Sequence, residues 1–294
     1  MASAMTSRPG LATVLRTVAA TGVAAGIASK FLLEDARADS PAAPRKVFGG
    51  GPAFFSLPLE SAEAVNHNTK RLRFRLDENA VTGLPLTSSL LTMSWPGGRW
   101  LPVVRPYTPV SGADEPGYVD FLIKRYPDGK SSTHLHALGP GDSLFFLAAL
   151  KGPQWTPNRH RHVTLIAGGA GITPVYQLAR GILRNPADRT AVTLVFGVNG
   201  DADVLLKREL EAFEKEFPGR FRAVYAVSRP GTGSPHRKGY VTGELLREVV
   251  PPEHGDGAVF VCGPPAMERA LVGGRGEKGV LEEMGYRKDQ IHKF

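Results

Sequence analysis

The feature that most constrains the fold is a change in the rhythm of apolar residues near Thr156. Before this point, short runs alternate apolar and polar side chains, a period of two that is typical of half-buried strands. Examples are Arg71–Leu76, Gly117–Tyr126 and Gly141–Leu150, with turn-forming clusters such as PGG, PDG and GPGD between them. Many short strands of this kind predict an antiparallel β-barrel for the first half of the chain.

After Thr156 the apolar runs become continuous and alternate with segments of helical spacing. The strand-like runs are His162–Gly169, Ala191–Val198, Phe221–Ser228 and Ala258–Gly263. The segments TPVYQLARGIL, Asp203–Phe217 and TGELLREVV between them have helical spacing, and a further helix is expected after the last strand. Buried strands that alternate with helices are typical of a doubly wound parallel sheet.

The chain is therefore expected to contain four segments. Residues 1–33 form a targeting or transmembrane segment, and residues 34–52, rich in Ala, Pro and Gly, form a linker. Residues 53–156 form the β-barrel domain and residues 157–294 the α/β domain. The expected fold class is thus all-β followed by α/β, with the folded body beginning near Phe54.

The first 33 residues have the composition of a mitochondrial targeting segment. They contain Arg8, Arg16 and Lys30, and no acidic residue occurs before Glu34. Residues 17–29 are uncharged and mostly small and apolar, and they approach the ~20 residues needed to span a bilayer only if the flanking cations reach opposite interfaces. Two interpretations stay open: an anchor in the outer mitochondrial membrane and a cleaved presequence.

Composition narrows the classes of partner. The formal net charge of +8 favours an acidic partner, but no zinc-ligand set, base-reading basic helix or RNA-binding aromatic signature is present. Nucleic acid is therefore not expected. Cys262 is the single cysteine, so no intramolecular disulfide can form, and the eight histidines lack metal-ligand spacing.

Two glycine-rich stretches follow predicted strands of the α/β half. GGAGITP, residues 168–174, leads from a strand into a helix, where free N–H groups can bind phosphate. Thr173 is expected to cap this helix, with Pro174 at its first position. CGPPAM, residues 262–267, follows a later strand. Because parallel strands end at one edge of a sheet, both stretches should flank one crevice, although each alone could be a structural turn.

The stretch RPYTPVS, Arg105 to Ser111, combines a cation, an aromatic ring and hydroxyls on a backbone stiffened by prolines. An arginine can bind a pyrophosphate with two hydrogen bonds. A tyrosine can lie along a flat heteroaromatic ring, and a threonine hydroxyl can bond a ring nitrogen. These residues suit a flavin dinucleotide on the barrel surface, although the stretch could also be an ordered turn.

RPYT, GGAGITP and CGPPAM, in this order across a boundary between a barrel and an α/β domain, resemble the ferredoxin–NADP-reductase superfamily. Within it they are most similar to the NADH–cytochrome b5 reductase family, and the leader and the ending RKDQIHKF resemble its fungal mitochondrial members. The resemblance covers about residues 54–294. It implies an FAD-binding barrel followed by an NAD-binding domain.

The resemblance also implies roles for individual residues. Arg105 would bind the FAD pyrophosphate, Tyr107 would pack on the isoalloxazine, and Thr108 would hydrogen-bond its reactive nitrogen. Lys124 would support the phosphate or ribitol side, and Ser132 in the loop from Gly129 would hold the pyrophosphate. Many relatives have Met where this chain has Ser131. The other residues implied to bind FAD are Pro106, Leu122, Gly129, Ser131 and Thr173.

NADH would bind the α/β half, with its phosphates near Gly169 to Gly171 and its nicotinamide near Cys262. The full set implied for NADH is Gly168, Gly169, Ala170, Gly171, Ile172, Ser228, Arg229, Cys262, Gly263, Pro264, Pro265 and Met267. Several relatives carry Asp where this chain has Ser228, which is followed by Arg229. Serine lacks the repulsion that a carboxylate exerts on a phosphate, so we expect NADH preference with weakened rejection of NADPH.

The expected activity is transfer of a hydride from NADH to FAD, followed by release of single electrons to an acidic haem protein of the cytochrome b5 type. Thr108 and Cys262 would lie at the reacting rings. Lys130, and less certainly Lys151, would contact the acceptor or merely be solvated. Phe294 would lie near the flavin or form a free tail, and the catalytic domain is expected to be monomeric. An NADPH-linked flavin reductase and a cofactor-free membrane-tethered module are the alternatives.

Overall fold

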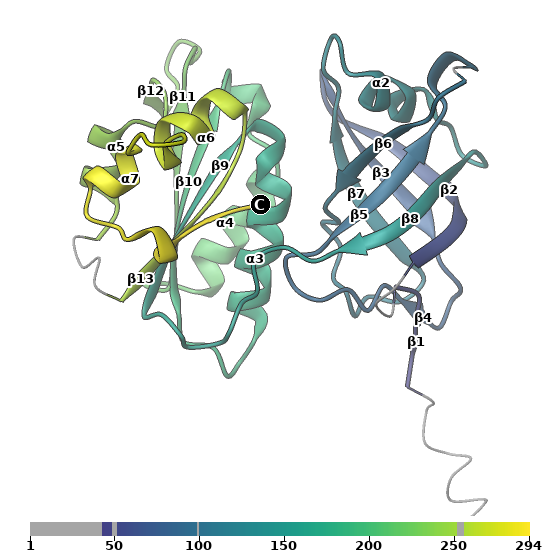
Figure 1. The fold of residues 1–294 in the computed structure, drawn as a ribbon, viewed down its shortest axis with the longest axis horizontal. Helices are drawn as coiled ribbons and strands as arrows, with labels where there is room; N and C mark the ends of the chain where they lie inside the picture. Colours follow the sequence, from purple (N-terminus) through teal and green to yellow (C-terminus); the bar gives the residue numbers. More distant parts are fainter. Residues whose placement is uncertain (1–42, 49–51, 99, 252–255) are drawn as a thin grey trace, which may run out of the picture. The chain divides into compact units, whose positions relative to one another are not determined.

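The computed structural model describes residues 43–48, 52–98, 100–251 and 256–294. Its elements are labelled as in Figure 1. The targeting or transmembrane segment predicted for residues 1–33 lies outside these residues. Within the described ranges, no helix combines the length and apolar character needed to cross a membrane.

The first half forms a six-stranded antiparallel sheet that curls into a barrel-like body (Figure 1), as the period-two pattern predicts. The strands lie in the order β6-β5-β8-β2-β3-β7. Their bounds are β2 Pro52–Asn66, β3 Thr69–Arg75, β5 Ser89–Ser94, β6 Val103–Tyr107, β7 Tyr118–Lys124 and β8 Ser143–Leu150. Two short strands, β1 Arg45–Lys46 and β4 Ala80–Val81, pair beside it.

Alternating side chains fill the interior of this sheet with large apolar residues. Phe74, Phe121 and Phe146 are fully buried, and Phe146 contacts the rings of both of the others. Phe48 also packs against Phe146 and is only 2% exposed. Ordered structure therefore begins before Phe54, the residue near which we expected the folded body to start.

The curled sheet is not closed by hydrogen bonds. Strands β6 and β7 stand at its two ends and do not pair with each other in the described part of the chain. Helix α2, Lys130–Ala137, contacts both end strands. A short helix therefore bridges the side of the barrel between β6 and β7. Each of these two strands keeps one edge that pairs with no other strand of the sheet.

The second half contains a parallel sheet in the order β12-β11-β10-β9-β13-β14, as predicted. Chain order reverses between β9 and β13, because β10 and β11 lie on one side of β9 and β13 lies on the other. The strand bounds are β9 His162–Gly168, β10 Ala191–Val198, β11 Phe221–Val227, β12 Arg237–Lys238, β13 Gly257–Cys262 and β14 Ile291–Lys293. Such a reversal point is where ligands bind in sheets of this class.

Helices cover both faces of the parallel sheet (Figure 1). Leu165 of β9 faces the core formed with α3 and α4, whereas its neighbour Ile166 faces the core formed with α5, α6 and α7. The helix bounds are α3 Ile172–Arg184, α4 Lys207–Glu216, α5 Gly243–Val249, α6 Pro265–Val272 and α7 Val280–Glu283. Short 3-10 turns occur at η1 Pro96–Gly98, η2 Gly169–Gly171, η3 Asp201–Asp203 and η4 Lys288–Gln290.

Two predicted helix starts were wrong. The helix expected from Asp203 begins at Lys207, because η3 comes first and Leu206 adopts a left-handed φ of 56°. The helix expected to be capped by Thr173 begins at Ile172, with Gly171 at the N-cap and no side chain bonded there. In both places an extra turn of 3-10 geometry lies between the strand and the helix, which periodicity alone does not reveal.

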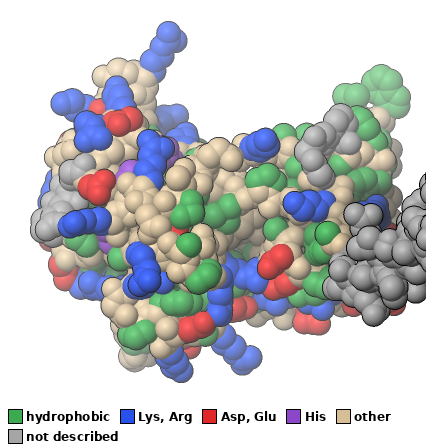
Figure 2. Space-filling model, turned by 90° about the horizontal axis from the view of Figure 1, so that it is seen from below, with side chains coloured by type: hydrophobic (Ala, Val, Ile, Leu, Met, Phe, Trp, Pro, Cys, Tyr) green, Lys and Arg blue, Asp and Glu red, His purple; other side chains and the backbone are tan. Residues whose placement is uncertain are grey.

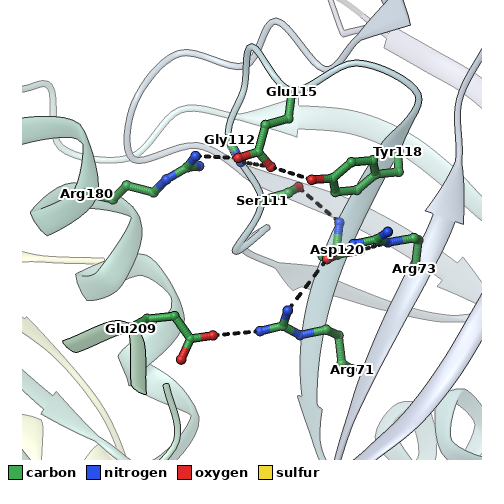
Figure 3. Close-up of polar contacts among 9 residues, drawn as sticks. All are labelled: Arg71, Arg73, Ser111, Gly112, Glu115, Tyr118, Asp120, Arg180 and Glu209. Atoms are coloured by element: carbon green, nitrogen blue, oxygen red, sulfur yellow. Dashed lines mark hydrogen bonds and ion pairs between the residues drawn. The ribbon is translucent and has the colours of Figure 1, made fainter. Parts of the chain in front are cut away.

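Ion pairs tie α3 and α4 to the barrel (Figure 3). Arg180 of α3 donates to Glu115 at 2.5 Å, and Arg71 of β3 donates to Glu209 of α4 at 3.0 Å. Behind Arg71, the buried carboxylate of Asp120 accepts two hydrogen bonds from Arg73. The charged side chains of the strand RLRFRL are therefore not all free in solvent, because Arg71 forms a contact between the two halves of the chain.

Replacing Phe146 by Ala is expected to lower the free energy of unfolding by about 3–5 kcal/mol, because it leaves a cavity among four aromatic rings. Urea denaturation of the full-length protein measures the loss. Phe54→Ala is the matched control, since Phe54 is 71% exposed and its removal should cost no more than about 0.5 kcal/mol. Equal effects of the two substitutions would contradict the assignment of the core.

Candidate active site

A cavity of about 1200 Å³ lies between the unclosed side of the barrel and the carboxyl ends of β9 and β13. Its wall includes β6 and β7, the loop that leads into α2, and the loops that follow β9 and β13. This volume exceeds the roughly 300–1,000 Å³ of a pocket for one small ligand. The cavity therefore has room for more than one ring system. Residues from both halves of the chain form its wall.

Most of the site residues predicted from sequence line this cavity. Those implied for FAD are Arg105, Pro106, Tyr107, Thr108, Leu122, Lys124, Gly129, Ser131, Ser132 and Thr173. Those implied for NADH are Gly168, Ala170, Gly171, Cys262, Gly263, Pro264 and Pro265. The motifs RPYT, GGAGITP and CGPPAM, separated by up to about half of the chain, thus meet in one place.

Five predicted residues do not line the cavity. Ile172 is fully buried in the core of the α/β domain, and Met267 packs beneath the loop glycines. Gly169 provides the positive φ of 53° that turns the chain from β9 into η2. Ser228 and Arg229 follow β11, where both are bonded to the carbonyl of Asn199 and lie outside the cavity wall.

The unpaired edge of β6 carries the cation and the aromatic ring of the RPYT stretch. The guanidinium of Arg105 bonds the carbonyl of Val104, and no described carboxylate forms an ion pair with it. Tyr107 is half-buried and donates its hydroxyl to Ser131 Oγ at 3.0 Å. Burial raises the pKa of Tyr107, so the phenol is neutral. This edge therefore presents an unpaired positive charge beside a flat uncharged ring.

The start of α2 adds a second group that suits an anion. Its N-cap is Gly129, which has no side chain to bond the first backbone N–H groups of the helix. The hydroxyl of Ser132 instead donates to the carbonyl of Gly129 and accepts from the backbone of Tyr126. Ser132 therefore shapes the turn, while the N–H groups of the helix face the cavity side without a side-chain cap.

Close contact between the two glycine-rich loops requires glycine. A Cβ on Gly171 would overlap the backbone carbonyl of Cys262, and one on Gly168 would lie 2.7 Å from Cδ of Pro264. Thr173, the second residue of α3, turns its hydroxyl back to the carbonyl of Ala170 at 3.3 Å. The loops after β9 and β13 thus form one continuous surface of the cavity.

The thiol of Cys262 is protonated at physiological pH. Burial raises its pKa to about 12, and the nearby charge of Glu268 acts in the same direction. A thiol in this state is a poor nucleophile. At the end of β13 it therefore acts as a small, neutral part of the cavity wall.

Several lining residues were not predicted from sequence. Tyr126, two residues past the end of β7, brings its hydroxyl near the backbone of Ala170 in the other half of the chain. Pro102, Val103 and Val104 extend the wall along β6, and Leu150 and Gly152 extend it beyond β8. Tyr126 could have been predicted from the sequence, because it lies two residues after Lys124, which the family resemblance assigns to the flavin.

Phe294 lies in the wall of the cavity and is tied in place. Its backbone N–H donates to the carbonyl of Val261 at 3.3 Å, and its ring lies 5.9 Å from that of Phe260. Of the two sequence interpretations, the untethered tail is therefore wrong for this residue.

Comparisons with known proteins agree with this architecture. The family model described as "Oxidoreductase FAD-binding domain" matches residues 56–156, and the "Oxidoreductase NAD-binding domain" matches residues 165–272. NADH-cytochrome b5 reductase 2 of Emericella nidulans is 46% identical over 97% of this chain and 91% of that protein. The protein of the same name from Pyricularia oryzae is 48% identical over 86% and 79%, respectively.

A solved structure gives the same result at greater sequence distance. The cytochrome b5 reductase domain of Ulva prolifera nitrate reductase has a TM-score of 0.73 and 27% identity, covering 82% of this chain and 97% of that domain. Fold, cavity and domain matches together define a flavin- and nicotinamide-dependent oxidoreductase. More narrowly, the chain belongs to the NADH–cytochrome b5 reductase family.

The residues present fit FAD as the bound cofactor. The free guanidinium of Arg105 and the uncapped start of α2 suit a pyrophosphate, and the unpaired edge of β6 offers backbone hydrogen bonds to a flat ring. The contiguous glycine loops after β9 and β13 leave room for a second nucleotide at the point where strand order reverses.

The raised pKa of Cys262 predicts resistance to alkylation. Near pH 8 the folded protein should hold about a thousandfold less thiolate than free cysteine, and its reaction with iodoacetamide should be slower in proportion. Reactivity should rise with pH in proportion to the thiolate and level off only near pH 12. Protein unfolded in urea is the control, and a folded-state rate within about tenfold of it would contradict the assignment.

Proposed function

We propose that this protein transfers electrons from NADH through bound FAD to a haem protein of the cytochrome b5 type. The observation that carries the proposal is the single cavity in which the FAD-side residues of β6, β7 and α2 face the loops after β9 and β13. The relatives named NADH-cytochrome b5 reductase 2 support the choice of reductant and acceptor.

Residues of the barrel hold the cofactor. Arg105 and the N–H groups at the start of α2 would bind its pyrophosphate, and Tyr107 would pack against its ring. When bound, FAD supplies the redox chemistry, because it takes up two electrons as a hydride and releases them singly. The protein therefore needs to supply binding and orientation, with no proton-relay group of its own.

Residues on both sides of the cavity would orient the reacting rings. Thr108 directly follows β6 and lines the cavity, and its hydroxyl would bond the reactive flavin nitrogen. Cys262 and Gly263 would shape the nicotinamide pocket, with a neutral thiol that introduces no charge beside the hydride. Holding the two rings in register can supply a large part of the rate.

The name of the relatives supports NADH as the preferred reductant, whereas Ser228 and Arg229 support weakened rejection of NADPH. They lie at the carboxyl end of β11, near the carbonyl of Asn199 at the end of β10, where the adenosine ribose of a dinucleotide would bind. Neither is acidic, so a phosphate on that ribose would meet no repulsion from this pair. This observation also keeps an NADPH-linked flavin reductase as the second candidate function.

Lys130 is the proposed contact for an acidic haem protein, with Lys151 as a second. Both line the mouth region of the cavity, where an acceptor must come close to the flavin. Figure 2 shows Lys and Arg side chains spread over the face that it presents, with Asp and Glu between them. Because the basic side chains on that face do not form one patch, we choose the candidate contacts for the acceptor by their proximity to the cavity.

Residues 1–33 are proposed to direct the protein to the mitochondrion and to hold it at the outer membrane. Support comes from their composition, with Arg8, Arg16 and Lys30 and no acidic residue before Glu34. The catalytic part is proposed to act as a monomer. Fractionation of cells expressing the full-length protein tests the location, and a cytosolic distribution would refute it.

Arg105→Ala is expected to weaken FAD binding, by roughly 10- to 100-fold in dissociation constant, because it removes an unpaired cation from the pyrophosphate site. FAD content after purification and fluorescence titration of the apoprotein measure the loss. Arg125→Ala is the control, since this exposed arginine lies one residue past β7 and outside the cavity wall. Undiminished FAD affinity in Arg105→Ala would count against the model.

The function itself is tested by comparing NADH with NADPH and cytochrome b5 with ferricyanide. We expect higher kcat/KM with NADH, and reduction of cytochrome b5 that falls steeply with ionic strength while ferricyanide reduction changes little. Lys130→Glu should raise KM for cytochrome b5 alone. A higher kcat/KM for NADPH would favour the second candidate, and failure to reduce cytochrome b5 would refute the proposed acceptor.

A further inference from the structure

A buried carboxylate of the α/β domain binds the cavity lysine of the barrel. Asp203, the last residue of η3, accepts a hydrogen bond from Lys124 Nζ at 3.0 Å. Its side chain is 8% exposed and that of Lys124 is 11% exposed. Lys124, which the family resemblance assigns to the flavin, therefore has its ammonium directed to a residue of the opposite domain.

The carboxylate is held from several sides. Asn68, in the turn between β2 and β3, donates to the same oxygen at 3.3 Å, and the backbone N–H of Gly200 donates to the other oxygen at 3.1 Å. Burial opposes ionisation of Asp203, but the bonds from Lys124 and Asn68 outweigh it and hold its pKa below the ordinary value. The Asp203 carboxylate is therefore ionised, and these hydrogen bonds fix its orientation.

Stability alone is a weak explanation for this pair. Removing two charges from water costs as much free energy as their attraction returns, so buried ion pairs add little net stability. Two further ion pairs join the domains, Arg71–Glu209 and Arg180–Glu115 (Figure 3). Their side chains are about one-quarter to one-third exposed and lie outside the cavity wall. Among the ion pairs of the described residues, only Lys124–Asp203 both spans the two domains and places a charged group in the wall of the cavity.

We propose that Asp203 is a positioning residue for hydride transfer. It fixes the Lys124 ammonium against the cavity wall, compensates its charge there, and joins η3 of the α/β domain to β7 of the barrel. This inference rests on the proposed function, because the two domains carry the two reacting rings. Loss of the carboxylate frees an uncompensated cation beside the flavin and loosens the register between the rings.

Two effects of opposite sense follow for Asp203→Asn. The rate of flavin reduction by NADH should fall about tenfold or more, since small misplacements of reacting groups are costly. The reduction potential of the flavin should rise, because an uncompensated cation stabilises the reduced, more negative cofactor. A residue that merely holds the interface together would lower stability without moving the potential.

The experiment uses full-length, FAD-loaded protein with Glu209→Gln as the matched control. Glu209 also accepts an ion pair from the barrel, but away from the cavity. Flavin reduction is followed in single turnovers with NADH, and the potential is measured by photoreduction, which needs no NADH. The expected result is a slower rate and a raised potential in Asp203→Asn, with both close to wild type in Glu209→Gln.

Lys124→Gln and the double variant Asp203→Asn/Lys124→Gln complete a double-mutant cycle, so that the test does not rest on Asp203→Asn alone. The lysine variant should lower the potential, because it leaves the carboxylate uncompensated, and the double variant should return it toward wild type. Equal behaviour of Asp203→Asn and Glu209→Gln in rate and potential, or a double variant whose potential stays as far from wild type as that of either single variant, would overturn the inference. Wild-type flavin that NADH cannot reduce would instead refute the proposed function, while the potentials would still test the pair.

Discussion

Strands β6 and β7 end the barrel sheet without pairing to each other, so in the described structure each leaves a row of backbone N–H and C=O groups without a strand partner. Unpaired edges are normally covered or charged. Here α2 bridges only part of the gap, and the rest opens into the cavity. The site depends on this incomplete closure, because in a closed barrel these backbone groups would be used in strand pairing.

The second constraint is the reversal of strand order between β9 and β13. It brings the turn at Gly171 against the backbone of Cys262, a contact that leaves no room for a Cβ. Helices α3 and α4 connect the α/β domain to the barrel through the ion pairs Arg180–Glu115 and Arg71–Glu209 (Figure 3). Both domains therefore shape the cavity, and its geometry depends on the contacts that join them.

Sequence reasoning recovered what local pattern determines. The strands β9, β10 and β11 were found within one residue at each end, because continuous apolar runs mark buried parallel strands. The predicted cap at Thr173 and the predicted start of a helix at Asp203 were wrong, since 3-10 turns that leave no periodic signal precede α3 and α4. The pairing of Lys124 with Asp203 joins residues 79 positions apart, and only the packed domains reveal it.

The central claim is that one cavity holds FAD against β6 and exposes it to NADH bound by the neighbouring sheet. Anaerobic titration of the purified full-length protein with NADH, followed by visible absorbance, tests it most directly. The account predicts yellow protein with an equimolar amount of FAD, bleached by one equivalent of NADH. Colourless protein that takes up no added FAD, or bound flavin that NADH leaves unbleached, would contradict it.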